Sequence, residues 1–205
     1  MGREYRQFCA VARALDVVGE RWTLLIVREL LLGERRYGEL LDALQGIGTN
    51  LLAARLTAMQ NQGLCTRAGR YYALTERGHE LREPVLALAR WGMAEMARPA
   101  GQDHMHPDWY AVAMLAAYEP SDGVPPDEEY EFDIDGVVFH LALTGGRPDA
   151  RRGSAGRAAF ALRAELPTFL RIATGSLPTD RAEIHGDSAA VSRWLASFHL
   201  LRDSL

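Results

Sequence analysis

The stretch "GIGTNLLAARLTAMQNQGL", residues 46–64, decides how the first half of this chain folds. Its apolar residues recur at helical spacing, at Leu52, Leu56 and Met59, which predicts a helix with one buried stripe. Thr49 can cap the N-terminus of this helix, and Gly63 stands where a left-handed residue ends it. The opposite face offers only small, uncharged side chains, so its role depends on the elements around the helix.

The residues around this stretch predict three more helices and a hairpin. The helices precede it, at 8–18, at 24–32 after Thr23, and at 35–44. Two short β-like runs follow it at 64–75, with a tight turn at Ala68-Gly69. Three short helices, a fourth that ends at glycine, and a hairpin are the order of a winged helix-turn-helix.

A longer helix closes this half of the chain. Thr75 is its predicted cap, and its apolar pattern continues to about Ala97. Pro84 interrupts the pattern, so we expect a kink or a break near Glu83.

The second half has a different pattern. Strict alternation of apolar residues around Asp135-Gly136 predicts a β-hairpin with one apolar face and with His140 on the other, exposed face. Further elements are predicted as a helix at 109–118, a strand at 158–164, a helix at 165–175, a strand at 181–186 and a helix at 188–201. The predicted domains are therefore residues 1–98 and 109–205, joined by a linker at 99–108 rich in Pro, Gly and polar residues.

Charge divides the chain in the same place. Residues 1–98 hold 14 arginines against 11 acidic residues, whereas residues 99–205 hold 9 against 16, and lysine is absent. We therefore expect only the first half to bind a polyanion.

The chain lacks an apolar run that could span a bilayer, and it lacks a recognisable secretory leader. Cys9 and Cys65 are too few for a disulfide scaffold. These features predict a soluble, cytoplasmic protein with no membrane partner.

The first half resembles the HxlR family of bacterial transcription regulators. The resemblance lies in Cys9, "LDVVGERWT" (15–23), "LLIVRELLLG" (24–33), "RRYGEL" (35–40), "LLAARL" (51–56) and "YALTERG" (72–78). It implies homodimers that are joined through the first and last helices of the domain and bind a two-fold operator in double-stranded DNA.

Carried over to this chain, the resemblance implies a recognition helix at 49–61. Its base-reaching positions are Thr49, Asn50, Ala53, Ala54 and Thr57. The implied backbone contacts are Arg55 beside them, Arg36 and Tyr37 in the preceding helix, and Arg67, Arg70 and Tyr71 in the wing. The family usually has a basic residue at the place of Asn50 and polar residues at those of Ala53 and Ala54.

The exposed face of the helix at 49–61 thus has few groups that could bind DNA, and two hypotheses follow. Either the helix still binds DNA, with asparagine able to pair with adenine and alanine methyls able to touch thymine methyls, or its function has degenerated. Cys9 also has two interpretations. It is a redox or electrophile sensor with Arg6 and Arg13 one turn away, or a small buried residue at the dimer interface.

The second half resembles the sterol-carrier-protein-like domain. The likeness lies in the order of a hairpin, a "DARRG" turn, a strand leading into "LPTFLRIATG", and a strand with "HGD" before a final helix. It implies an α/β sheet with helices around an apolar cavity that holds lipids, with no catalytic residue. The pocket candidates, for which core packing is the alternative role, are Phe132, Phe139, Leu141, Phe160, Phe169, Leu170, Ile172, Trp194 and Phe198.

The expected fold is thus α+β, a winged helix-turn-helix followed by an α/β sterol-carrier-like domain. The expected function is that of a DNA-binding regulator modulated by an apolar ligand. The alternative is a lipid or metabolite carrier whose winged helix serves for dimerisation. No enzyme motif or cofactor site is apparent, and the spacing in "DHMHPD" (103–108) matches no closed metal site.

Overall fold

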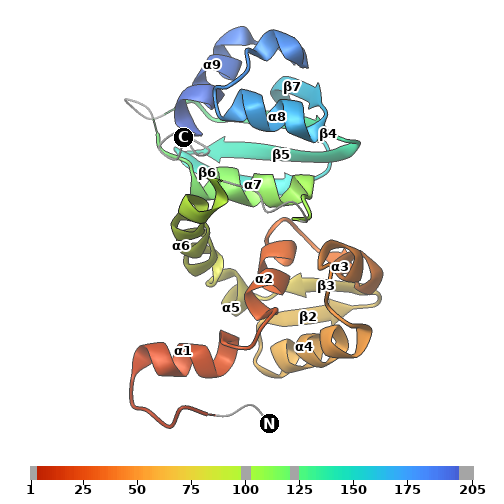
Figure 1. Cartoon of the computed structure of the whole chain (residues 1–205), viewed down its shortest axis with the longest axis vertical. Coiled ribbons are helices and arrows are strands. Elements are labelled where there is room, and N and C mark those ends of the chain that lie inside the picture. Colours follow the sequence, from red (N-terminus) through yellow and green to blue (C-terminus); the bar gives the residue numbers. More distant parts are fainter. Residues whose placement is uncertain (1–3, 98–102, 121–124, 199–205) are drawn as a thin grey trace. The chain divides into compact units, whose positions relative to one another are not determined.

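The computed structural model describes residues 4–97, 103–120 and 125–198 (Figure 1). The chain separates into two compact units, Met1–Val85 and Leu86–Leu205. The division falls within a helix, whereas the predicted linker lies further along the chain. Part of that linker, residues 98–102, is outside the described residues, so the predicted boundary stays a prediction.

The first unit is a winged helix-turn-helix. Its elements are α1 (Ala10–Val18), α2 (Thr23–Leu31), β1 (Arg35–Arg36), α3 (Tyr37–Ala43), α4 (Thr49–Asn61), β2 (Cys65–Ala68), β3 (Tyr71–Leu74), α5 (Glu76–His79) and the start of α6 (Arg82–Met93). The predicted helices and hairpin are confirmed within two residues. Strand β1 was not predicted, because two residues carry no periodicity. It exists through antiparallel pairing with β3, which completes a sheet of order β1-β3-β2.

Helix α4 buries the predicted stripe, since Leu52, Leu56 and Met59 are at most 2% exposed. The prediction that Thr49 caps the helix is wrong. The extended residue before the helix is Gly48, and no side chain caps this end. The C-terminus is as predicted: Gly63 has a φ of 69°, and the N–H of the next residue, Leu64, donates to the Met59 carbonyl at 2.8 Å.

The wing and the break after it also follow the prediction, with small shifts. Ala68 pairs with Tyr71, so the hairpin loop is Gly69-Arg70, one residue later than expected. The hydroxyl of Thr75 accepts a hydrogen bond from the Gly78 N–H at 3.1 Å, which caps α5. The break precedes Arg82 rather than Glu83, and Pro84 therefore lies in the first turn of α6, where its missing N–H costs nothing.

The second unit is a mixed sheet covered by helices. It holds the rest of α6, η1 (Ala94–Ala97), α7 (Pro107–Ala116), β4 (Glu128–Ile134), β5 (Val137–Thr144), β6 (Arg147–Arg152), β7 (Ala158–Ala164), α8 (Leu166–Ala173), η2 (Thr179–Arg181), β8 (Glu183–Gly186) and α9 (Ser188–Ser197). The strand order is β6-β5-β4-β7-β8, and β4 and β7 are the parallel pair. This unit has the mixed α/β character that the sequence predicts.

One predicted turn is wrong. Residues 149–153, "DARRG", largely belong to strand β6, which pairs with β5, and the chain turns only at Gly153, whose φ is 87°. Only Ala150 of this strand is buried, so it has no apolar alternation from which it could be recognised. The predicted hairpin turn is confirmed, because Asp135 and Gly136 both have positive φ, at 52° and 79°.

The core of the second unit is aromatic. The Phe132 ring lies 5.2 Å from that of Phe139, 5.8 Å from that of Phe169 and 5.3 Å from that of Trp194, measured between centroids. Helices α8 and α9 therefore cover the apolar face of the sheet (Figure 1). His140 lies on the opposite face, half-exposed rather than fully exposed, with its Nδ1 2.9 Å from the Gly153 carbonyl.

Among the described residues, no helix has the length and apolarity to cross a membrane.

Candidate nucleic-acid interface

The exposed side of α4 carries the five predicted base-reaching residues. All five are solvent-exposed: Thr49, Asn50, Ala53, Ala54 and Thr57. The Thr57 hydroxyl donates to the Ala53 carbonyl at 3.0 Å, within the helix. The Tyr37 hydroxyl donates to the Thr49 carbonyl at 2.6 Å, so α3 holds the first turn of α4 in place. The face is accessible and uncharged.

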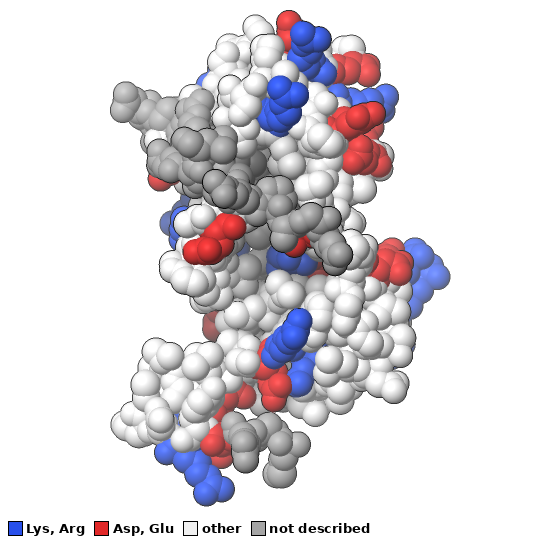
Figure 2. All heavy atoms as spheres, in the orientation of Figure 1, with Lys and Arg blue, Asp and Glu red and all other residues white. Residues whose placement is uncertain are grey.

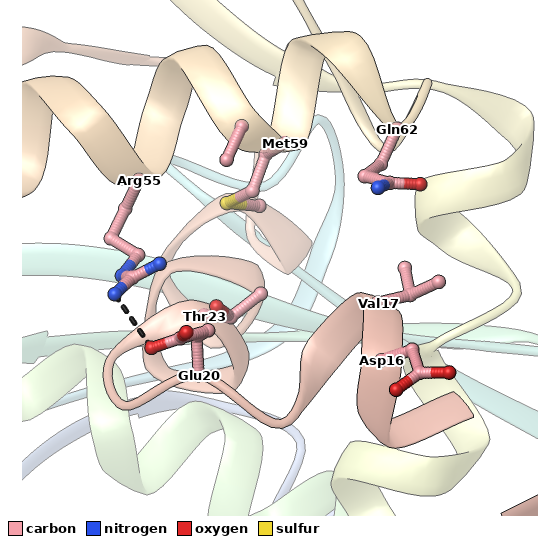
Figure 3. A pocket seen from close by; sticks show the side chains of 8 residues that line it. Asp16, Val17, Glu20, Thr23, Arg55, Met59 and Gln62 are labelled. Carbon is pink, nitrogen blue, oxygen red and sulfur yellow. Dashed lines mark hydrogen bonds and ion pairs between the residues drawn. The ribbon is translucent and has the colours of Figure 1, made fainter. Parts of the chain in front are cut away.

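Arg55 does not lie with these residues. Its Nη2 is 2.7 Å from Oε2 of Glu20, in the turn between α1 and α2 (Figure 3). The Arg55 side chain is only 22% exposed, which fits its turned-in position. The structure therefore gives Arg55 an intramolecular partner, and its contact with a DNA phosphate stays a prediction. The sequence could not reveal this, because Glu20 is 35 positions away.

This ion pair borders a small pocket of about 130 Å³ between α4 and the α1–α2 segment (Figure 3). Its lining residues are Asp16, Val17, Glu20, Thr23, Arg55, Ala58, Met59 and Gln62. Pockets for drug-sized ligands are usually roughly 300–1,000 Å³, so this one has room for a few waters or a very small molecule. The ion pair at its edge links α4 to the turn between α1 and α2.

The basic side chains stand on the wing and on β1. Nε and Nη2 of Arg36 donate to the Tyr71 hydroxyl at 3.1 and 2.9 Å. This hydrogen bond raises the pKa of Arg36 and lowers the pKa of Tyr71. The Arg70 guanidinium lies 5.6 Å from the centre of the Tyr71 ring, and Nε of Arg67 donates to the Gly69 carbonyl at 2.9 Å. Three predicted arginines and one tyrosine thus gather on one small sheet.

A buried ion-pair network supports this sheet, and sequence reasoning missed it. Glu29 is 1% exposed, and its carboxylate accepts hydrogen bonds from Arg28 at 2.7 and 3.0 Å. Nη2 of Arg35 is 3.1 Å from the same carboxylate, which anchors β1 to α2. The neighbouring Arg36 N–H donates to the Glu39 carboxylate at 2.7 Å, at the start of α3. The only signal was the charged Arg28-Glu29 pair within an otherwise apolar run.

Helix α1 presents an apolar face to solvent. Val11 and Leu15 on α1 are 67% and 41% exposed, and Phe8, which lies two residues before the helix begins, is 105% exposed. Cys9 beside them is also exposed, and Arg13 is 3.7 Å from Asp16. Cys65, by contrast, is buried, and burial raises the pKa of its thiol to about 11.

Charge on the visible face of the molecule is mixed. Figure 2 shows acidic and basic side chains interspersed there, with most of that surface uncharged. On this face, attraction to a polyanion would come from a few local arginines rather than from a broad basic field. Within the ranges that the structure describes, no group of three His, Cys, Asp or Glu side chains is placed to hold a metal ion. At the end of the predicted linker, Asp108 is 2% exposed, and its Oδ2 lies 2.7 Å from Nε of Arg152.

These features together define a winged helix-turn-helix protein. Residues 17–99 match the family described as HxlR-like helix-turn-helix. The HTH-type transcriptional regulator Rv3095 of Mycobacterium tuberculosis is 41% identical over 99 residues, which are 45% of this chain. This chain spans 62% of that relative's length.

The HTH-type transcriptional regulator sll1512 of Synechocystis is 33% identical over 96 residues, covering 43% of this chain and 71% of the relative. The chain therefore belongs to the HxlR-like helix-turn-helix family, a family of transcription regulators. Among solved structures, quinone-bound YodB from B. subtilis is 28% identical, covers 40% of this chain and 93% of its own, and has a TM-score of 0.38.

Proposed function

We propose that this protein regulates transcription by binding double-stranded DNA, with α4 in the major groove and the wing on the backbone. The observation that carries the proposal is the separation of roles on the surface. An accessible, uncharged helix face stands in the same unit as Arg36, Arg67 and Arg70 on the small sheet. Base edges are read by the first kind of surface, and phosphates are bound by the second.

The test is the binding of the full chain to the DNA upstream of its own gene at several salt concentrations. Three phosphate-binding arginines in each half of a dimer predict a plot of log affinity against log salt with a slope of about −5. Affinity that stays flat between low and physiological salt would contradict the proposal.

We further propose that the protein is a homodimer whose contact includes α1. The support is the row Phe8, Val11 and Leu15, which is more exposed than an apolar row in an isolated chain should be. Trp91 on α6 is 76% exposed and Leu88 is 50% exposed, so the last helix offers a second apolar surface. Light scattering after gel filtration should give a dimer for the native chain and a monomer for Phe8→Glu. A native monomer would refute this part.

For the second unit we propose the binding of an apolar ligand, as in a sterol-carrier-like domain. The order of hairpin, strand, α8, strand and α9 supports the resemblance. Native mass spectrometry of the purified chain should detect a bound lipid. Lipid without any DNA affinity would instead favour the alternative function, a carrier that uses its winged helix only to dimerise.

The sensor role of Cys9 is also a proposal, and its exposure in the single chain supports access by small oxidants. Cells that carry Cys9→Ser should lose the transcriptional response to a quinone or hypochlorite but keep basal regulation. An unchanged response would leave Cys9 as an interface residue.

A further inference from the structure

From Asn50 to Thr57, the predicted base-reaching residues of α4 combine one amide with three methyl groups. Asn50 lies in the first turn, and Ala53, Ala54 and Thr57 follow on the same exposed side. The Thr57 hydroxyl has given its only proton to the Ala53 carbonyl at 3.0 Å, so its methyl is what remains for apolar contact. The single charged residue of this helix, Arg55, is held by Glu20 at 2.7 Å.

Such a face selects among base pairs by simple chemistry. Thymine is the one base that presents a methyl group in the major groove, and adenine presents the donor and acceptor that an asparagine amide can match. Guanine is read chiefly by arginine or lysine. Helix α4 has no lysine, and its one arginine, Arg55, is paired with Glu20. From residue 53 to residue 57 the helix rises about 6 Å, which corresponds to about two base-pair steps.

We infer that each operator half-site carries thymines, on either strand, within two or three consecutive base pairs that face Ala53, Ala54 and Thr57, and an adenine that faces Asn50. The inference rests on the proposed DNA binding and adds the base sequence that this surface recognises. Affinity and specificity then come from different elements. Arginines of β1 and the wing supply the salt-dependent part, and α4 supplies a part that salt barely changes.

The methyl contact can be tested by removing it from the DNA alone. The full chain is used to select duplexes from a random pool, and each thymine of the selected site is then replaced singly by deoxyuridine, which lacks the C5 methyl. Burial of one methyl group changes affinity about fourfold. We expect a loss of that size at two or three clustered thymines per half-site, and no change at thymines in the flanks.

The protein side of each contact is tested by the ratio of affinities for the thymine duplex and the deoxyuridine duplex. Ala53→Gly and Ala54→Gly should each abolish the preference for thymine over deoxyuridine at one position and keep it elsewhere. Each variant is compared with itself on the two duplexes, so any loss of helix stability cancels. Asn50→Ala should keep the methyl preferences and lose the preference for adenine at its own position.

Two results would overturn the inference. If a selected site binds with salt dependence but no deoxyuridine replacement weakens it, the methyl readout is wrong while the proposed function stands. The same holds if the selected half-sites are rich in G·C pairs. If no duplex is retained from the pool at low salt, the proposed function itself fails, and the inference fails with it.

Discussion

The sheet of the second unit and the surface of the first unit differ in how they hold aromatic side chains. In the second unit Phe132, Phe160 and Trp194 are at most 1% exposed and contact one another. In the first unit the core is mostly aliphatic, while Tyr71 stands half-exposed among arginines and Phe8 is fully exposed. The comparison teaches that the rings between sheet and helices in the second unit stabilise that unit. Phe8 and Tyr71 of the first unit remain accessible to solvent.

The largest expected effect is in the aromatic core. Phe132→Ala should lower the free energy of unfolding of the second unit by about 3–5 kcal/mol, because it removes a ring that contacts Phe139, Phe169 and Trp194. Chemical denaturation followed by tryptophan fluorescence measures the loss. Val138→Ala, on the other face of the same sheet, is the matched control and should cost far less. Equal losses would mean that the rings do not form the core.

The next effect concerns the buried network of the first unit. Glu29→Gln leaves Arg35 without the carboxylate that lies 3.1 Å from its Nη2, and should cost about 3 kcal/mol. Denaturation of the variant should be compared with that of Glu34→Gln, which changes an exposed carboxylate in the same segment. We also expect weaker DNA binding, because β1 carries Arg36 on the same short strand. A variant as stable as the control would show that the network is dispensable.

A smaller effect distinguishes the contribution of the arginines to DNA affinity from that of the exposed face of α4. Arg36→Ala should weaken binding to all duplexes alike and reduce the salt slope of a dimer by about two. Tyr71→Phe removes the hydroxyl that holds Arg36 but keeps both the charge and the ring, so it should preserve the slope with a modest loss of affinity. Fluorescence anisotropy at several salt concentrations distinguishes the two. A change of base preference in Arg36→Ala would break the division between backbone and base contacts.

The smallest effect is a pH dependence of the second unit. The hydrogen bond from Arg193, 2.7 Å from Oε2 of Glu128, lowers the pKa of that carboxyl. A lowered pKa stabilises the folded state above the ordinary glutamate value of about 4.3, and this stabilisation disappears as the pH falls through the lowered pKa. The stability difference between the native chain and Glu128→Gln should thus be greatest near neutral pH and shrink in acid. A difference that grows in acid would have the wrong sign.

The sequence predicted what local periodicity controls and missed what distant partners create. Helix α4 and the β4–β5 hairpin were predictable because apolar spacing and turn residues are contained within each segment. Strand β6 was not, since its "RPDARR" sequence pairs with β5 without an apolar alternation of its own. Strand β1 was missed for the same reason, because pairing with β3 alone makes it a strand.

The candidate interface shows the same limit for single side chains. The exposed positions of α4 follow from the buried stripe, so Asn50, Ala53 and Thr57 could be assigned from spacing. The orientation of Arg55 could not, because a carboxylate from a distant turn decides it. The hydrogen bond between Arg36 and Tyr71 also joins residues 35 positions apart, and only the folded sheet brings them together.

Strand β4 lies at the centre of the second sheet, and this position affects the order in which the strands can pair during synthesis. Every strand pair of the first unit lies between Arg35 and Leu74, so that unit has all its strands early in synthesis. The β4–β5 hairpin must instead wait for residues 158–164 before β7 can cover its open edge. During that interval it carries Phe132 without the rings of Phe169 on α8 and Trp194 on α9 that contact it in the folded unit. Until those later residues are made, the hairpin therefore has an unpaired strand edge and an uncovered apolar face, which are the features that favour aggregation.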